Sequence, residues 1–322
     1  MRTKEATTAG RYLSMQTALR RKVRRAKDAT RRLVFASERR HIAVRRHLAG
    51  RYLEGDGLEV GALHLPLSLP RGARARYVDR MSVADLRAHY PELDEYELVN
   101  PDFIDDGEAL TSVPDASMDF VIVNHLIEHC QDPIGALLSH ARVLREGGVL
   151  YLAAPDRRRT DFDREREETS LEHLLRDHEQ GPEGSRSLHY EEWSRLAIKV
   201  PEGDVAEHAS ALERQDYSIH FHTFTLTSFL ALMLRAREAY GLPFEVVATE
   251  TNNHEFIVIA RKTATRAEAM SQVVGAGSAA SFKGRARSAS SPEAFPNLAF
   301  AALGSKLLVS RCCFRSSAYP SP

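Results

Sequence analysis

Short apolar runs rich in β-branched residues alternate with helical stretches over much of this chain. Stretches such as VADLRAHY (83–90) and PIGALLSHARVLRE (133–146) separate most of the runs, which lie at residues 58–60, 75–79, 96–100, 118–124 and 148–155. Strands that alternate with helices predict a parallel sheet covered on both faces. The chain is therefore predicted to have an α/β fold with a doubly wound sheet.

The order of elements changes near the end of this region. The run SIHFHTF (218–224) is followed by a helical stretch over 225–240 and by two strand-like runs, 244–250 and 255–262. Only residues 251–254 separate the last two runs, whereas a parallel crossover needs a dozen or more residues. These two runs are therefore predicted to form an antiparallel hairpin.

Three segments differ in composition from this pattern, which leaves residues 51–262 as the main domain. Residues 156–215 are polar and charged with a helical pattern, and their length predicts an inserted helical lid. Residues 263–322 are rich in Ala, Ser, Gly and Arg and are predicted to form a disordered tail. Residues 1–50 carry 15 Lys and Arg against 3 acids and are predicted to form a basic helical extension.

The basic extension is open to two interpretations. In the first, it is a solvated arm or a helix that covers the domain edge. In the second, it contacts RNA or phospholipid. Basic runs without interleaved aromatic residues are weak evidence for a nucleic-acid site. The formal net charge of the whole chain is zero, so the molecule as a whole is not drawn to nucleic acid. Three cysteines without paired spacing favour the cytoplasm, and no apolar run is long enough to predict a membrane span.

Three acids and a glycine lie on or just after the first three predicted strands. Glu59 lies on the first strand with Gly61 after it, and Asp79 ends the second strand, 20 residues after Glu59. An acid at this distance can accept hydrogen bonds from ribose hydroxyls. Asp102 follows the third predicted strand, next to Phe103. Because ligands bind at the carboxyl ends of such strands, these residues together predict a nucleotide-cofactor site.

The segment SMDFVIVNHLIEHCQDPIGALLSHARVLREGGVLYLAAP (117–155) resembles the class I S-adenosylmethionine-dependent methyltransferases that carry EH after the fourth strand and RVL…GG before the fifth. The resemblance covers residues 57–262, interrupted by the insertion. It implies a Rossmann-like, seven-stranded, mostly parallel sheet that ends in an antiparallel hairpin. It also implies S-adenosylmethionine as the cofactor, and no G-x-G-x-x-G motif for nicotinamide cofactors is present.

The resemblance implies a role for each matched position. Glu59 would face the methionyl amino group, and Asp79 would accept the ribose hydroxyls. Asp102 would accept the adenine amino group, although Asp105 and Asp106 compete for that role. The remaining positions are expected to line the cleft or to let the backbone approach the cofactor: Gly61, Ala62, Phe103, Asn124 and His125.

The first loop departs from the family pattern E-x-G-x-G-x-G. Leu63 and Leu65 replace the second and third glycines, and Pro66 follows. A loop of this kind can still present backbone amides, because cofactor contact uses main-chain groups. The alternative is a decayed loop in a protein that keeps the fold and binds nothing.

Methyl transfer requires an aligned nucleophile, and an oxygen nucleophile also benefits from a general base. His189 in HYEEW is the preferred base because it lies in the predicted lid, and His125 and His129 are the other candidates. His220 and His222 in H-x-H lack a third ligand, so no metal site is predicted.

The function predicted from these features is methyl transfer to a hydroxyl or carboxyl group of a small molecule or glycan. The alternative is a catalytically silent scaffold that uses the fold to bind a protein or RNA partner through the basic N-terminal arm. The sequence does not indicate the oligomeric state.

Overall fold

The computed structural model describes residues 38–263, which form a seven-stranded sheet in the order β3-β2-β1-β4-β5-β7-β6. Neighbouring strands are parallel except at β7, which is antiparallel to both β5 and β6. The strands are β1 (Gly55–Val60), β2 (Ala73–Asp79), β3 (Phe103–Ile104), β4 (Met118–Asn124), β5 (Leu144–Pro155), β6 (Phe244–Asn252) and β7 (Glu255–Lys262). The predicted α/β sheet with its closing antiparallel hairpin is confirmed.

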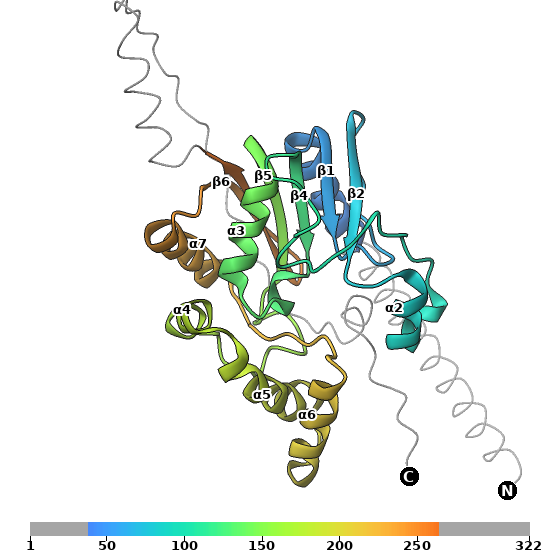
Figure 1. Ribbon diagram of the computed structural model, residues 1–322, viewed down its shortest axis with the longest axis vertical. Coiled ribbons are helices and arrows are strands. Elements are labelled where there is room, and N and C mark those ends of the chain that lie inside the picture. Colours follow the sequence, from blue (N-terminus) through green and yellow to red (C-terminus); the bar gives the residue numbers. More distant parts are fainter. Residues whose placement is uncertain (1–37, 264–322) are drawn as a thin grey trace, which may run out of the picture.

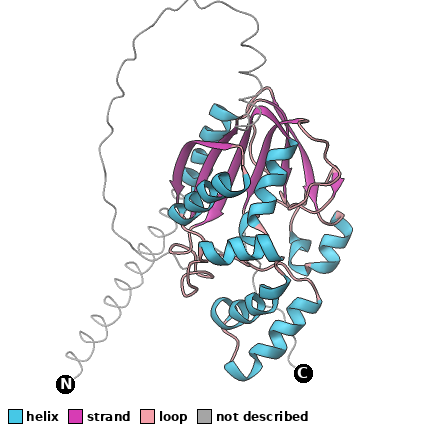
Figure 2. Cartoon of the chain, turned by 60° about the vertical axis from the view of Figure 1, so that its left-hand side comes forward, coloured by secondary structure: helices cyan, strands magenta, loops and turns pink. Residues whose placement is uncertain are grey.

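The helices lie on both faces of the sheet and beyond one end of it (Figures 1 and 2). After β2 the α-helices are α2 (Val83–His89), α3 (Pro133–Val143), α4 (Leu171–Gln180), α5 (Glu183–Glu192), α6 (Val205–Arg214) and α7 (Leu226–Tyr240). Short turns of helix occur at Pro91–Glu95, Ile127–His129, Trp193–Ile198 and Glu202–Asp204. In the described part of the chain, every helix is too short or too polar to cross a bilayer.

Alternate residues of the central strands build two separate cores. Val121 and Val123 of β4 pack in a core with residues of α3 and α7, whereas Phe120 and Ile122 lie in a second core. This division follows from the two-residue period of a strand, which points successive side chains to opposite faces. The sheet is therefore covered on both faces, as the continuous apolar runs predict.

A helix over residues 38–52 covers the second core. Leu48 and Ala49 of this helix are buried against the sheet, and Arg45 bonds the carboxylate of Glu255 on β7. The C-terminal part of the basic segment therefore packs on the main domain. Residues 1–37 and 264–322, the rest of the predicted extension and most of the predicted tail, lie outside the described residues.

The inserted segment between β5 and α7 contains α4, α5 and α6 and has a small core of its own. Tyr190, Trp193, Leu212 and Phe221 are buried together there. Beside them, the fully buried guanidinium of Arg166 bonds Asp163 and Glu192 and lies over the Trp193 ring. In Figure 1 this segment lies below the sheet, at the same end as α2.

Two predicted strands are wrong. Residues 96–100 are not a strand, because Leu98 packs against α2 and the Val99 N–H donates to Leu63 in the first loop. Residues 218–224 make only an isolated bridge between Asp156 and Phe224. Their backbone bonds other partners, such as the carbonyl of Glu128. The apolar residues of both segments suggested strands, but whether such a segment joins a sheet depends on its tertiary contacts.

Candidate active site

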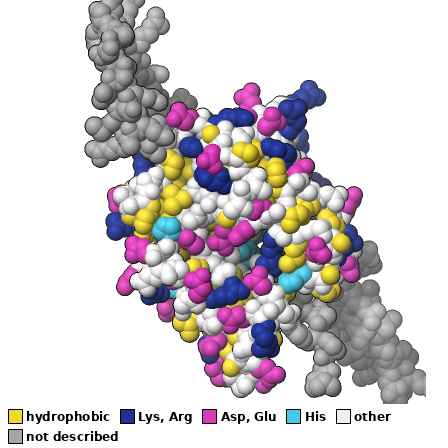
Figure 3. All heavy atoms as spheres, viewed as in Figure 1, with side chains coloured by type: hydrophobic (Ala, Val, Ile, Leu, Met, Phe, Trp, Pro, Cys, Tyr) yellow, Lys and Arg dark blue, Asp and Glu magenta, His cyan; other side chains and the backbone are white. Residues whose placement is uncertain are grey.

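A pocket of about 640 Å³ lies at the carboxyl ends of β1, β2 and β4 and beside the residues that follow β3. Its other wall comes from the inserted segment and from residues 216–221. The volume is within the usual range for a site that encloses a small molecule. On the side seen in Figure 3, acidic and basic side chains are interspersed over the surface around a hollow.

Asp79 lines this pocket at the end of β2, where the sequence places it. Its carboxylate accepts one long hydrogen bond, 3.4 Å from the Met81 N–H. Burial raises the pKa of Asp79, and backbone hydrogen bonds oppose that rise. A partly buried carboxylate with so little local support is suited to accept hydrogen bonds from a bound ligand.

The first loop leaves the pocket open despite its two leucines. Gly61 has φ 67°, a conformation that favours glycine, and it lines the pocket together with Leu63. Leu63 packs against the cluster around α2, and Leu65 is 48% exposed and does not line the pocket. Neither leucine therefore fills the cavity.

Glu59 does not line the pocket but holds the first loop through a hydrogen bond at Leu67. Its carboxylate accepts the Leu67 N–H at 2.8 and 3.1 Å and is almost completely buried. Burial raises the pKa of Glu59 to about 7, although the Leu67 N–H and Arg45 lower it. The Asn124 amide lies near enough to lower this pKa as well, but it makes no hydrogen bond of normal geometry in the described chain.

Several predicted cofactor residues do not line the pocket: Glu59, Ala62, Asp102, Phe103 and Asn124. The prediction that Asp102 follows the third strand is wrong, because β3 begins at Phe103. The Asp102 carboxylate instead accepts the Tyr77 N–H at 2.7 Å. Phe103 lies under the guanidinium of Arg76, 4.9 Å from its ring centroid.

Asp105 and Asp106, the competing candidates, do line the pocket after β3. The Asp105 carboxylate is occupied by the side chains of Thr111 and Ser112 and by the Ser112 N–H. Burial alone would raise its pKa, but these hydrogen bonds lower it overall. Asp106 is exposed, and one of its oxygens accepts the Glu108 N–H. Asp106 is therefore the better placed of the two to accept a ligand's amino group.

His125 lines the pocket and lies beside two carboxylates. Its Nε2 lies 2.8 Å from Glu255, and its Nδ1 lies 3.5 Å from Glu128. Burial would lower its pKa, but these two carboxylates raise the pKa to about 10. These contacts favour the charged form of the ring, which has no lone pair to accept a proton, so the geometry favours another residue as the base. The role of His125 as a base stays a prediction.

His129 also lines the pocket and has the opposite protonation. Its Nδ1–H donates to the Ile219 carbonyl at 2.8 Å, which leaves Nε2 as the nitrogen with a lone pair. Burial, followed by the nearby His220, lowers its pKa to about 4. His129 is therefore neutral at pH 7 and has a nitrogen able to accept a proton.

His189, the preferred base, does not line this pocket. It is buried beside His173 and His222, and burial lowers its pKa to about 3. One wall of the pocket is aromatic and was not predicted from the sequence. It comes from the inserted segment and its neighbours: Tyr90, Phe162, Tyr190, Trp193, Tyr217 and Phe221. The aromatic content of residues 156–221 was the only signal for it.

A family model for a methyltransferase domain matches residues 60–152. A probable S-adenosylmethionine-dependent methyltransferase of Mycolicibacterium smegmatis is 34% identical over 125 residues, which are 37% of this chain and 45% of that protein. Its counterpart in Mycobacterium tuberculosis is 32% identical over 124 residues, 37% of this chain and 42% of that protein. The match thus spans less than half the length of these relatives.

Among solved structures, a crystal structure of a methyltransferase from Methanosarcina mazei has a TM-score of 0.37 and 19% sequence identity. The similarity covers 66% of this chain and 95% of that one.

Proposed function

We propose that this chain, whose residues 60–152 match a methyltransferase domain, is a class I S-adenosylmethionine-dependent methyltransferase. We propose further that it transfers the methyl group to a hydroxyl or carboxyl group of a small molecule or glycan. The observation that carries the proposal is Asp79, a poorly supported carboxylate in a pocket at the carboxyl ends of the strands. The inserted segment is proposed to act as the lid over the acceptor.

The cofactor is proposed to lie along the β1, β2 and β3 ends of the pocket. Asp79 would accept the ribose hydroxyls, and Asp106 would accept the adenine amino group. Gly61 would let the backbone approach the cofactor, and Glu59 would act indirectly by holding the loop through Leu67. When bound, S-adenosylmethionine supplies an electrophilic methyl group on a sulfonium.

The acceptor is proposed to bind between this methyl group and the aromatic wall. Tyr190, Trp193 and Phe221 offer flat apolar surfaces, which suit a ring compound or the apolar face of a sugar. With the cofactor bound, a hydroxyl acceptor placed here would pass its proton to His129 Nε2 as its oxygen takes the methyl group. A carboxyl acceptor, which is already ionised at neutral pH, would need no base. The buried carbonyl of Ile219 holds His129 in the tautomer that this step requires.

Calorimetric titration of the full chain with S-adenosylhomocysteine tests the cofactor site. Replacing Asp79 by Asn removes a charged acceptor, and a hydrogen bond to a charged group contributes about 1.5–3 kcal/mol. We therefore expect Asp79→Asn to bind roughly 10- to 150-fold more weakly. Asp94→Asn, at an exposed acid in the turn after α2, is the matched control and should bind like the wild type.

Two results would contradict the cofactor assignment: no binding by the wild type at millimolar cofactor, or equal binding by Asp79→Asn. The second result is also the one expected of a catalytically silent scaffold. A panel of hydroxyl- and carboxyl-bearing compounds and glycans, assayed by release of S-adenosylhomocysteine, then tests the acceptor class.

The same assay tests the base once a hydroxyl acceptor is found. His129→Gln should lower kcat by about 10²- to 10⁴-fold, the usual contribution of general base catalysis, and should leave cofactor affinity unchanged. His125→Gln is a less informative comparison because it also breaks contacts with two buried carboxylates. Full activity in a folded His129→Gln variant would remove His129 from the mechanism.

A further inference from the structure

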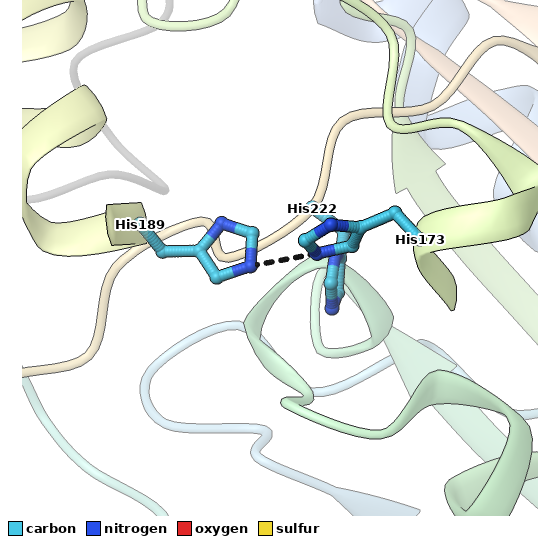
Figure 4. A group of neighbouring side chains, drawn as sticks. All are labelled: His173, His189 and His222. Carbon is cyan, nitrogen blue, oxygen red and sulfur yellow. Dashed lines mark hydrogen bonds between the residues drawn. The ribbon is translucent and has the colours of Figure 1, made fainter. Parts of the chain in front are cut away.

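Three histidines from separate parts of the chain meet next to the pocket but are not part of its lining. His173 comes from α4, His189 from α5 and His222 from the segment that leads to α7 (Figure 4). One ring nitrogen of each lies within 4.8 Å of the other two. His189 and His222 are buried, and His173 is partly buried. No metal site is predicted from the sequence, because only His222 of the H-x-H pair belongs to this cluster and the other two histidines lie tens of residues away along the chain.

The hydrogen bonds of this cluster leave a ring nitrogen of His222 available to a metal ion. The Nε2–H of His222 donates to the Gln131 carbonyl at 3.2 Å, which leaves Nδ1 with its lone pair. That Nδ1 is buried and has no hydrogen-bond partner in the described chain. Neutral imidazole is the form that coordinates metals.

The spacing also suits a metal ion. The Nε2 atoms of His173 and His189 are 3.0 Å apart. Two imidazole nitrogens on a tetrahedral zinc ion, each at about 2.0–2.1 Å from the metal, are roughly 3.3 Å apart. Small side-chain rotations therefore separate these nitrogens to the ligand distance. A backbone carbonyl that orients a ligand through its second ring nitrogen, as Gln131 orients His222, is typical of bound histidines.

From this geometry we propose that His173, His189 and His222 bind a divalent transition-metal ion of the zinc class. The buried carboxylate of Asp177 lies 3.0 Å from His173 Nε2, is held by the Ser185 hydroxyl, and offsets the charge of the cation. Binding at His173 Nε2 moves the proton of that ring to Nδ1. The Arg176 guanidinium, which now donates to this Nδ1 and is half exposed, then swings into solvent.

The metal would clamp the inserted segment to the pocket. His173 and His189 belong to α4 and α5, whereas His222 bonds the backbone of Gln131 and Glu128 beside His129. One ion would thus join the two helices of the proposed lid to the loop that carries the proposed base. This assignment does not depend on the proposed methyl transfer.

The test is calorimetric titration of the chelator-treated full chain with ZnCl₂ at pH 7.5. We expect one strong site per chain, weakened about 100-fold or more in His189→Gln and in His222→Gln. Two variants should keep wild-type affinity: His47→Gln, at an exposed histidine of the 38–52 helix, and His129→Gln, in the neighbouring cluster of Glu128, His129 and His220. Circular dichroism checks that each variant is folded.

X-ray absorption on the zinc-loaded wild type gives a second measurement that needs no variant. Three imidazoles at about 2.0–2.1 Å from zinc are expected. The proposal is overturned if the wild type binds no zinc at 100-fold excess, if both folded variants bind as tightly as the wild type, or if the spectrum shows fewer than two imidazoles. A protein that binds zinc but not S-adenosylhomocysteine would sink the proposed function and leave this site intact.

Discussion

Arg45→Gln is the substitution whose effect on stability follows most directly from the structure. Arg45 donates from Nε and from its terminal nitrogen to the two oxygens of Glu255, at 2.9 and 2.5 Å. The Arg45 side chain is 13% exposed and that of Glu255 is fully buried. Gln has a helix propensity close to that of Arg, so the change removes the charge pair and leaves the helix over residues 38–52 intact.

The expected cost of Arg45→Gln lies at or just below the lower limit of the range for a broken buried ion pair. Removing one partner of such a pair usually costs about 3–5 kcal/mol, because the other charge is left buried. Glu255 keeps two other donors, His125 at 2.8 Å and the Asn252 amide at 2.8 Å. We therefore expect Arg45→Gln to lower the free energy of unfolding by about 2–3 kcal/mol, and Tm by roughly 5–10 °C.

Urea unfolding of the full chain measures this difference. Circular dichroism follows the whole fold, and the fluorescence of Trp193, the single tryptophan, follows the inserted segment. Arg74→Gln is the matched control, because the Arg74–Asp56 pair is exposed on both sides and should leave the midpoint unchanged. A midpoint for Arg45→Gln equal to that of the control would refute the claim that helix 38–52 supports the sheet through a buried charge.

Two further predictions concern His125 and Gly61. The pKa of His125 is raised to about 10, so its stabilisation is complete below its unfolded value of 6.5 and is lost as pH rises toward 10. The difference in unfolding free energy between wild type and His125→Gln should therefore shrink over that range in urea titrations at several pH values. Gly61→Ala places a side chain at φ 67° and should cost about 1–2 kcal/mol and weaken cofactor binding. Gly50→Ala, in open space on the helix over 38–52, should instead stabilise the protein by up to about 1 kcal/mol and leave cofactor binding unchanged.

The strand–helix order and the closing hairpin could be predicted because both depend on local features. The apolar pattern of a strand can be recognised within one short segment of sequence. The connection between Asn252 and Glu255, which pair in the hairpin, is too short for a parallel crossover. β3 could not be predicted in the same way. It has only two residues, and its place beside β2 depends on backbone bonds rather than on an apolar pattern. The misplaced third acid, Asp102, follows from that miss.

The histidines could be found but their roles could not be assigned from sequence. The charged form of His125 is favoured by Glu255, whose carboxylate lies 2.8 Å from its ring although it is 130 positions away in sequence. His129 is neutral because its ring is buried and its Nδ1–H meets a carbonyl 90 positions away. His189 was preferred because of its place in the inserted segment, yet its ring turns toward His173 and His222. Protonation depends on such distant neighbours, which a sequence pattern does not contain.

The bulky first loop shows which glycine the backbone path requires. Gly61 has a positive φ, and an added Cβ there would meet only ordinary contacts, so its conformation rather than crowding is the constraint. Leu63 also has a positive φ of 49°, a strained value for leucine, but packing of its side chain against the α2 cluster offsets the cost. The Glu59 carboxylate then closes the loop on the Leu67 N–H. A loop whose path is held by one glycine, one apolar anchor and one buried acid can keep its amides near a ligand without the other glycines. Loosening that path at Gly61 should therefore weaken cofactor binding more than changing the exposed Leu65.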